Sequence, residues 1–501
     1  MIRLAIICFL ISMIRSEECI FNINDVYELR QLFHDSERRI EAATRGQRGN
    51  AAIVIGSARS GKSTLINYLM GNALIAYNEK REIKIKKANN NVRGPEIGAG
   101  SVSVTTIPTK WNSERSALQN LDFWDTAGFE DNRGEKEDIN NAFHMYHLTK
   151  KVDSLKLILV ISYGEITSGN INQILTFLKT VEGYFNNTFK DIFPSISVII
   201  SKAPNKINND YPVDSEFLNY NLNTNLLSSP ELDISEVSKE FVRHIINNNQ
   251  RVAFFRKVKK VGRVTSDIDD NIIPAITNCD SIRKPSHQDI GFTFSVKSKL
   301  CLQRTNDDLL NMNDFTDLTL KVNNRYIDNY NDLNRTLDKS VLLQKKSSFK
   351  QIYSRINISS LDNSDAKFKI KILEESDNIV RDFITNKNLE NKISLTEFID
   401  SIIMSGKIIR INILLEAIVK LLVDRTSFLI SSCELKENRI DIDELNRRQG
   451  EFETLQEERI KEMEERIRNE KKPKKEEGFW RRFFRLYAEC ARANPAAAVR
   501  G

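Results

Sequence analysis

The sequence predicts an α/β fold with a doubly wound, mostly parallel sheet, followed by a small β element and a helical C-terminal region. Short and almost wholly apolar runs occupy residues 51–55, 155–162 and 196–200, and segments of helical periodicity lie between them. Such runs are typical of parallel strands that helices cover on both faces. Beyond about residue 265 the pattern changes, first to short alternating segments and then to long helical stretches.

The first 16 residues have the order of a secretory signal peptide. A basic start, Met1–Arg3, precedes the apolar run Leu4–Met13, and the small residue Ser16 comes just before Glu17. The apolar run is too short to cross a hydrocarbon core of ~30 Å. We therefore expect a mature chain that begins near Glu17, in the secretory pathway or outside the cell. The alternative is a buried N-terminal element in a cytoplasmic protein.

The composition is globular and excludes several classes of protein. The chain has 74 Lys and Arg against 68 Asp and Glu, a formal net charge of +6. On a chain of 501 residues this excess is too small to indicate nucleic acid as a partner, and we expect none. Five His and six scattered Cys, without a CxxC pair, leave little material for a zinc cluster.

An odd number of cysteines remains once the signal peptide is removed: Cys19, Cys279, Cys301, Cys433 and Cys490. Cys279 and Cys301 are candidates for one disulfide. At least one thiol must then stay free or pair with another chain.

The elements of the predicted α/β domain follow one another along the chain. A helix is expected over residues 26–43, a short second one over residues 64–70, and a third over residues 171–181, because apolar residues recur there at helical spacing. The predicted strands cover residues 51–55, 121–124, 155–162, 196–200 and 252–255.

The small β element is predicted from alternation in two places. Phe292, Phe294 and Val296 are separated by single polar residues. Leu318, Leu320 and Val322 alternate in the same way. A period of two is that of a half-buried strand.

The rest of the chain is expected to be helical. Its most apolar stretch, residues 408–423, contains Arg410, Glu416 and Lys420, which favours a buried bundle helix over a membrane span. Residues 434–472 are dominated by charges over a broken heptad, so they form either a coiled coil or a solvated helix packed on its own bundle. We therefore expect six segments: signal peptide 1–16, N-terminal helical segment 17–47, α/β domain 48–265, small β-containing region 266–339, helical bundle 340–433, and charged helix with basic aromatic tail 434–501.

The loop after the first strand fits the pattern G-x-x-x-x-G-K-[ST] without a gap, from Gly56 to Ser63. It follows a buried strand and opens a helix, as a phosphate-binding loop requires. Its glycines let the backbone bend around phosphate oxygens, and its N–H groups with the helix dipole supply positive potential. Lys62 would reach the β- and γ-phosphates, and the Ser63 hydroxyl would ligate Mg²⁺.

Two further segments fit the same site. Asp125, at the end of a strand, can hold a magnesium water, and the Gly128 N–H three residues later can bond a γ-phosphate oxygen. The Gly-rich segment 98–107 ends in Thr105 and Thr106, one of which would complete the magnesium shell. The alternative for that segment is a Gly-rich hairpin with a Thr-rich strand.

In this order, the loop, the paired threonines and the turn Asp125–Gly128 resemble the G domain of translation-factor-type P-loop GTPases. Residues 125–134, Asp-Thr-Ala-Gly-Phe-Glu-Asp-Asn-Arg-Gly, are similar to the immunity-associated (avirulence-induced) GTPases and the septins. Arg59 resembles the loop arginine of guanylate-binding proteins and atlastins, where it is a built-in arginine finger. The resemblance covers about 200 residues and implies GTP and Mg²⁺ as ligands, with hydrolysis supported by Lys62, Arg59 and Thr106. The implied nucleotide-binding residues are Gly56, Ser57, Ala58, Arg59, Ser60, Gly61, Lys62, Ser63, Thr64, Asp125, Gly128 and Lys202, and the implied metal ligands are Ser63, Thr105, Thr106 and Asp125.

The sequence departs from these families in two places. The base-reading motif [NT]-K-x-D corresponds to Ser201–Pro204, which keeps Lys202 but has no Asp, so ATP remains an alternative to GTP. Phe129 stands where Ras-like GTPases place the Gln that orients the attacking water, so unassisted hydrolysis should be slow. A GTPase that acts as a switch or an assembly module is therefore weighed against a nucleotide-binding pseudo-GTPase scaffold that works through its helical half.

Two kinds of partner are expected besides the guanine nucleotide. A homodimer could form through the G domain or the C-terminal helices, which would complete the site. Residues 479–487 interleave aromatic and basic side chains, which favours either contact with a membrane surface or a terminal helix docked on the bundle.

Overall fold

The computed structural model describes residues 19–47, 49–98, 105, 107–129, 133–167, 171–207, 210–229, 232–356, 364–438, 442–469 and 485–486. The chain divides into two compact units, which we describe separately. The α/β unit is Asn24–Cys301, and the helical unit is Met1–Ile23 with Leu302–Gly501. The boundary expected after residue 265 does not coincide with this division. The expected signal peptide and nearly all of the basic aromatic tail lie outside the described residues.

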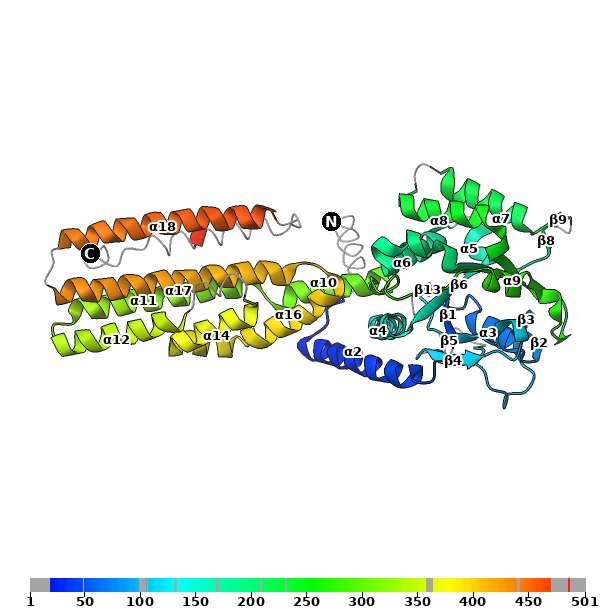
Figure 1. The fold of residues 1–501 in the computed structure, drawn as a ribbon, viewed down its shortest axis with the longest axis horizontal. Coiled ribbons are helices and arrows are strands. Elements are labelled where there is room, and N and C mark those ends of the chain that lie inside the picture. Colours follow the sequence, from blue (N-terminus) through cyan, green and yellow to red (C-terminus); the bar gives the residue numbers. More distant parts are fainter. Residues whose placement is uncertain are drawn as a thin grey trace, which may run out of the picture. The chain divides into compact units, whose positions relative to one another are not determined.

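A mixed, mostly parallel sheet of eight strands forms the centre of the α/β unit, in the order β12-β10-β7-β6-β1-β5-β4, with β13 paired to β6 (Figure 1). Its strands are β1 (Asn50–Ile55), β4 (Thr109–Asn112), β5 (Leu121–Asp125), β6 (Ser154–Ser162), β7 (Ile196–Ala203), β10 (Val252–Arg256), β12 (Asp269–Asp270) and β13 (Ile282–Arg283). The pairs joining β10, β7, β6, β1 and β5 are parallel, and β4, β12 and β13 are antiparallel to their neighbours. All five predicted strands are thus confirmed.

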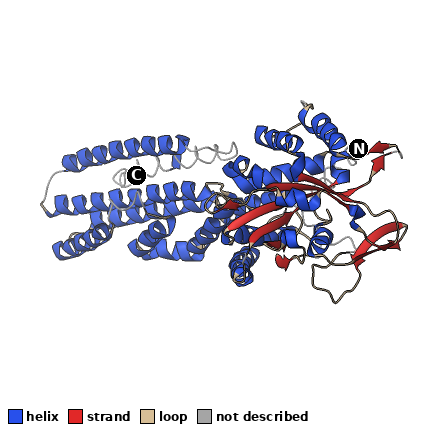
Figure 2. Cartoon of the chain, turned by 45° about the vertical axis from the view of Figure 1, so that its right-hand side comes forward, coloured by secondary structure: helices blue, strands red, loops and turns tan. Residues whose placement is uncertain are grey.

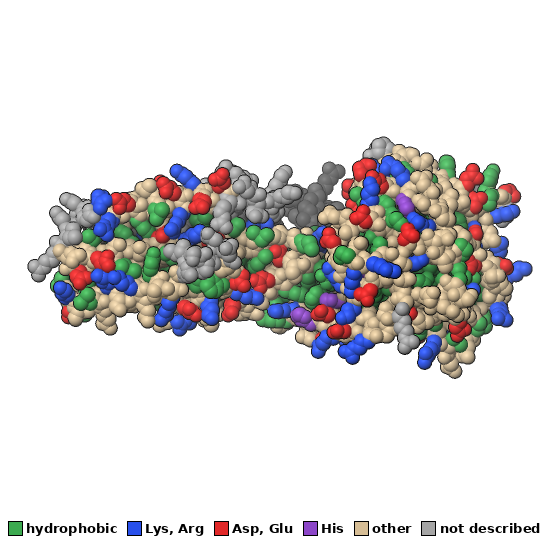
Figure 3. Space-filling model, viewed as in Figure 1, with side chains coloured by type: hydrophobic (Ala, Val, Ile, Leu, Met, Phe, Trp, Pro, Cys, Tyr) green, Lys and Arg blue, Asp and Glu red, His purple; other side chains and the backbone are tan. Residues whose placement is uncertain are grey.

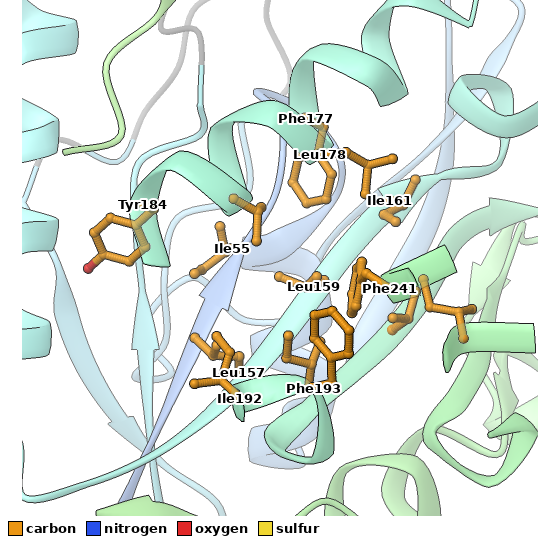
Figure 4. Close-up of a cluster of buried hydrophobic side chains, with 14 of the residues drawn as sticks. Ile55, Leu157, Leu159, Ile161, Phe177, Leu178, Tyr184, Ile192, Phe193 and Phe241 are labelled. Atoms are coloured by element: carbon orange, nitrogen blue, oxygen red, sulfur yellow. The ribbon is translucent and has the colours of Figure 1, made fainter. Parts of the chain in front are cut away.

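Helices cover both faces of this sheet, as the apolar runs predict. One core contains Ile53 and Ile55 of β1 and alternate residues of β6, packed under α4, α6 and α8 (Figure 4). The other core contains Ala52 and Val54, packed under α3 and α9. Successive residues of a strand point to opposite faces, so a strand that is covered on both sides is apolar throughout. The helices of the unit are α2 (Ile23–Thr44), α3 (Lys62–Met70), α4 (Glu135–Lys151), α5 (Tyr163–Thr167), α6 (Asn172–Phe185), α7 (Ser215–Leu222), α8 (Glu236–Asn247) and α9 (Ile272–Thr277).

Two small sheets in the α/β unit were not expected from the sequence. One has three antiparallel strands, β2 (Leu74–Glu79), β3 (Glu82–Lys87) and β11 (Gly262–Arg263), in the order β11-β2-β3. The other is the hairpin of β8 (Lys206–Ile207) and β9 (Tyr211–Pro212).

The described part of the helical unit contains helices only, whereas the α/β unit carries the strands (Figure 2). Its helices are α11 (Met312–Arg335), α12 (Lys339–Arg355), α14 (Ala366–Ser376), α15 (Asn378–Asn386), α16 (Leu389–Ile403), α17 (Lys407–Glu437) and α18 (Ile442–Asn469), and α10 (Val296–Leu309) straddles the unit boundary. The core gathers around α17. There Lys369, which is fully buried, donates to the Asn412 Oδ1 at 2.8 Å and lies 3.7 Å from the Glu416 Oε2.

The small β element predicted over residues 292–296 and 318–322 is wrong. Val296 begins α10, and Leu318 and Val322 lie within α11 with Phe315 and Tyr326 on its buried face. Those four residues follow helical spacing, and the apparent alternation arises because Leu320 happens to stand between two of them.

The bundle helix predicted around residues 408–423 is present as α17, with Arg410 and Glu416 buried within the unit. No helix of the described chain is long and apolar enough to cross a bilayer. The charged segment forms α18, and Ile460 and Met463 of this helix join the core around α17.

The disulfide suggested between Cys279 and Cys301 does not form. Cys279 is a free, buried thiol, and so is Cys433, whereas Cys19 and Cys301 are each disulfide-bonded. Burial raises the pKa of the Cys279 thiol to about 11, so it stays protonated at neutral pH.

Candidate functional site

The carboxyl ends of the parallel strands bring the predicted site residues to one edge of the large sheet. Val54 of β1 lies opposite Asp125 of β5, and Ser162 of β6 lies opposite Ser201 of β7. The loop after β1, Asp125 and the end of β7 with Lys202 therefore meet at this edge. Open α/β sheets bind their ligands there.

The loop between β1 and α3 folds around its own lysine. Gly61, just before α3, has φ 97°, in the left-handed region that glycine adopts without strain. The Lys62 Nζ donates hydrogen bonds to the carbonyl oxygens of Gly56 and Ser57, both at 3.1 Å, and only 7% of this residue is exposed. The loop thus holds a buried ammonium group beside the amino end of a helix, where an anion is stabilised.

Neighbouring strands fix the shape of this loop. The Ser201 Oγ of β7 donates to the carbonyl oxygen of Ser60 at 2.5 Å. Gly56 lies directly against β6, so that an added Cβ would collide with the carbonyl oxygen of Val160. The loop is therefore held in its curved form before any ligand arrives, which lowers the entropic cost of binding.

Two hydroxyl groups converge on Asp125. The Ser63 Oγ and the Thr105 Oγ1 donate to its Oδ2 at 3.1 and 3.0 Å. Asp125 is 1% exposed, and this burial raises the pKa of its carboxyl group, while the charge of Lys62 and the two hydroxyl groups oppose the rise. Carboxylate and hydroxyl oxygens are hard ligands of the kind that Mg²⁺ takes, so Ser63, Thr105 and Asp125 fit a magnesium ion.

Thr106, the alternative to Thr105, lies outside the described residues. The described residues include no group of three or more His, Cys, Asp or Glu that could hold a metal. A magnesium ion at Asp125 would therefore keep several waters or take ligand oxygens, as that ion commonly does.

The turn after β5 is tied to the loop by backbone hydrogen bonds. The Phe129 N–H donates to the Gly56 carbonyl at 3.2 Å, and the Ala58 N–H donates to the Phe129 carbonyl at 3.3 Å. Gly128 stands so close that an added Cβ would be 2.5 Å from the Ala58 Cα and 3.0 Å from the Lys62 Nζ. Gly128 therefore lies directly against the loop, and its bond to a γ-phosphate oxygen stays a prediction.

The side chain of Phe129 points into the core and away from this edge. It is 5% exposed and lies 5.8 Å from Phe177 of α6, ring centre to ring centre. An apolar ring in the core cannot orient a water molecule. Phe129 therefore has a structural role, because its ring packs the turn against the sheet.

Lys202 reaches back to the loop from β7. It has φ 55°, and its Nζ donates to the carbonyl oxygen of Arg59 at 2.8 Å. Burial lowers the pKa of Lys202, while the negative charge of Glu165 opposes this effect. Arg59 itself has φ 64°, the left-handed conformation that is strained for a residue with a side chain.

Glu165 is a site residue that sequence reasoning missed. It lies in α5 just after β6, is 8% exposed and accepts hydrogen bonds from the Ser162 N–H and the Ser57 side chain. Burial raises the pKa of its carboxyl group, and the charges of Lys202 and Lys62 oppose the rise. Its position just beyond the carboxyl end of a buried strand was the available signal.

The segment after β7 offers no carboxylate where a base-reading Asp would stand. The chain turns back at Asn205, whose carbonyl oxygen accepts from the Val213 N–H at 3.0 Å, and Asp210 lies in the β8–β9 turn. Asp214 caps α7 by accepting from the Phe217 N–H at 3.0 Å. Asp214 therefore has a local structural role.

The close packing of Gly56 and Gly128 gives a direct test of this geometry. Gly56→Ala and Gly128→Ala should each destabilise the α/β unit by about 1–3 kcal/mol, because the new Cβ meets backbone atoms that cannot yield. Urea unfolding measures the effect. Gly164→Ala is the matched control, since its Cβ would enter open space in α5, and it should be neutral or slightly stabilising. Equal unfolding midpoints for all three variants would contradict the described packing.

The α/β unit is thus an open, mostly parallel sheet, and a loop centred on Lys62 lies at the carboxyl ends of its parallel strands. Comparison with family models and with curated proteins finds no match to the chain.

Proposed function

We propose that the protein binds a nucleoside triphosphate as a P-loop GTPase and hydrolyses GTP slowly with Mg²⁺, acting as a nucleotide switch or assembly module. The observation that carries the proposal is the loop Gly56–Ser63, which curves around the Lys62 ammonium while Ser63 and Thr105 converge on Asp125. A loop of this kind provides backbone N–H groups, a point charge and hard oxygen ligands for a magnesium triphosphate.

In this proposal each residue has a defined task. The loop N–H groups and Lys62 bind the phosphate oxygens, replacing the carbonyl oxygens that Lys62 now contacts. Ser63, Thr105 and the buried Asp125 hold the magnesium ion or its waters, and that ion would neutralise charge on the phosphates. Gly128, which packs on Ala58, would sense the terminal phosphate through its N–H.

Slow turnover is expected from the position of Phe129 in the turn after β5. Phe129 is in the core, so it contributes nothing to the orientation of water. Arg59 remains as the source of transition-state charge stabilisation, in cis or towards a second subunit. The same observation favours the second candidate, a pseudo-GTPase scaffold that binds nucleotide without turning it over.

One observation favours ATP as the alternative to GTP. Ser201–Asn205 contain no acidic residue, and Asp214 is engaged at the start of α7. Without a carboxylate to accept the guanine N–H groups, the site loses the contact that discriminates guanine most strongly.

A secretory location is proposed on two observations. The first is the signal-like segment 1–16. The second is that Cys19 and Cys301 are disulfide-bonded, which is typical of chains that mature in an oxidising compartment. A cytoplasmic location stays the alternative.

Thermal unfolding of the purified protein with GTP, GDP or ATP, each with and without Mg²⁺, tests the proposal. A ligand at about 100 times its dissociation constant stabilises the bound state by about 2.7 kcal/mol. We expect a magnesium-dependent shift with GTP. A shift of equal size with ATP would move the assignment to a general nucleoside triphosphatase. The absence of any shift with all three nucleotides would contradict the proposal.

A further inference from the structure

The positive charge of the chain is concentrated beside the site, on the small sheet β11-β2-β3 and the loop before it. Residues 79–87 and 256–263 together hold ten basic and two acidic side chains, a net charge of +8. The whole chain has a net charge of +6, so the remaining residues carry −2. This region therefore dominates the positive field of the protein.

The two basic segments lie at the same end of the small sheet. In the β2–β3 hairpin, Glu79 pairs with Glu82, so Lys80 and Arg81 form the turn, with φ 50° and 70°. β11 runs antiparallel to β2, with Gly262 opposite Ala76, so the residues before Gly262 lead towards the hairpin turn. Val258 and Val264 are packed on the core and anchor this loop at both ends.

Between these anchors the loop presents cations around an exposed apolar side chain. Lys259, Lys260 and Arg263 are exposed, and Val261 among them is 55% exposed. Lys80 and Arg81 of the hairpin turn are exposed as well. Figure 3 shows Lys and Arg side chains along the edge of the α/β unit where Figure 1 places β2 and β3. We call Lys80, Arg81, Lys259, Lys260 and Val261 the basic tip.

The cations of the basic tip form no ion pair with the described residues. The ion pair formed within the hairpin joins Lys84 to Glu79 and leaves out the turn residues Lys80 and Arg81. Within the described part of the chain, no carboxylate lies within ion-pair distance of the four basic side chains of the tip. Glu79 and Glu82 flank the hairpin turn, and the hydrogen bond from Lys84, together with the charge of Lys80, lowers the pKa of Glu79. Four cations on this turn and the neighbouring loop still outnumber these two carboxylates and repel one another, so an anionic partner would relieve this cost.

We propose that the basic tip docks the α/β unit on an anionic lipid bilayer, with Val261 entering the headgroup region. Cations around a protruding apolar residue combine electrostatic attraction to anionic lipid with a small buried apolar area. A nucleic acid is the less favoured partner, since its bases need an aromatic platform. The aromatic residue of this sheet, Tyr77, is only partly exposed, and the ammonium of Lys86 stands 5.0 Å over its ring.

Vesicle cosedimentation of the full chain tests this proposal. Vesicles in which roughly one lipid in three is phosphatidylserine and the others are phosphatidylcholine are compared with pure phosphatidylcholine at physiological salt. We expect binding to the anionic vesicles alone. The double variant Lys259→Glu/Lys260→Glu should bind at least about tenfold more weakly, because each basic residue near an anionic surface contributes a several-fold factor. Val261→Ser should also weaken binding while it leaves the net charge of the basic tip unchanged, because it removes only the apolar side chain.

Lys179→Glu is the matched control for charge reversal. Lys179 lies on α6, outside the basic tip, and pairs with Asp233 at 2.6 Å, so its loss should leave vesicle binding unchanged. Because the basic aromatic tail is a second candidate for lipid contact, the tip variants are also made with Arg481→Glu/Arg482→Glu. Binding that depends on the tail and not on the tip would overturn the proposal. So would equal binding of the Lys259→Glu/Lys260→Glu variant, or binding to an oligonucleotide in preference to anionic vesicles.

Discussion

Replacing Lys62 with alanine is expected to remove almost all of the stabilisation that a nucleoside triphosphate gives to the wild-type protein. The Lys62 ammonium is buried at the centre of the loop and is the basic group that the curved backbone encloses. An ammonium at this place contributes its full charge to a triphosphate in surroundings of low polarity. If affinity falls ~100-fold, the stabilisation at the same nucleotide concentration falls from about 2.7 to about 0.4 kcal/mol.

Thermal unfolding with and without nucleotide measures this loss, and each variant is compared with its own ligand-free state. That comparison matters because Lys62 also bonds Gly56 and Ser57, so the variant is expected to lose some stability without any ligand. Lys179→Ala is the control, since that exposed lysine lies on α6 and pairs with Asp233. A wild-type nucleotide shift in Lys62→Ala would show that the loop is not the binding site.

The parallel strands were predictable because burial on both faces of the sheet requires an almost continuous apolar sequence. Within β1, β6 and β7, residues 51–55, 155–161 and 196–200 are apolar, with only Lys156 and Ser197 as polar interruptions. Lys156 is tolerated because its ammonium donates to the carbonyl oxygens of Ile276 and Cys279 at the end of α9. The contact that permits this exception comes from a helix about 120 residues further along, so no local pattern reveals it.

The antiparallel elements and the helix after residue 312 show where the sequence misleads. β3 reads Glu-Ile-Lys-Ile-Lys-Lys, and its many lysines conceal a strand that is paired on one side only. In α11, buried Leu318 and Val322 are four residues apart, and Leu320 between them imitates a strand pattern. A short sequence window cannot distinguish the strand period of two residues from the helix period of about 3.6, whereas the full length of the helix can.

The candidate site was predictable where one segment carries it and less so where segments meet. The loop Gly56–Ser63 and Asp125 follow from local motifs. Thr105, one of two equal choices, contacts Asp125, whereas Thr106 lies outside the described residues. Glu165 was not predicted from the sequence because it belongs to no motif. Its place beside Ser57 and Lys202 arises from the neighbouring positions of β1, β6 and β7 in the sheet.

The second large effect is expected at Arg59, where stability and turnover should change in opposite directions. Arg59 has φ 64°, a conformation that costs an L-residue about 1–2 kcal/mol relative to glycine. Strain of this kind persists where the surrounding structure requires it. Here the Arg59 carbonyl oxygen accepts a hydrogen bond from the Lys202 Nζ at 2.8 Å. Arg59→Gly should therefore unfold at a higher temperature than the wild-type protein in the absence of nucleotide.

The same substitution should lower single-turnover hydrolysis at least about tenfold, with little change in nucleotide affinity, because an arginine finger acts on charge that develops in the transition state. Arg59→Ala should show the same loss of turnover without the gain in stability, since alanine keeps the strain. Met404→Gly relieves a left-handed residue at the end of α16 and should leave turnover unchanged. If the arginine acts between subunits, wild-type turnover should also rise with protein concentration. An unchanged single-turnover rate in both Arg59 variants would remove this residue from the mechanism and favour the pseudo-GTPase scaffold.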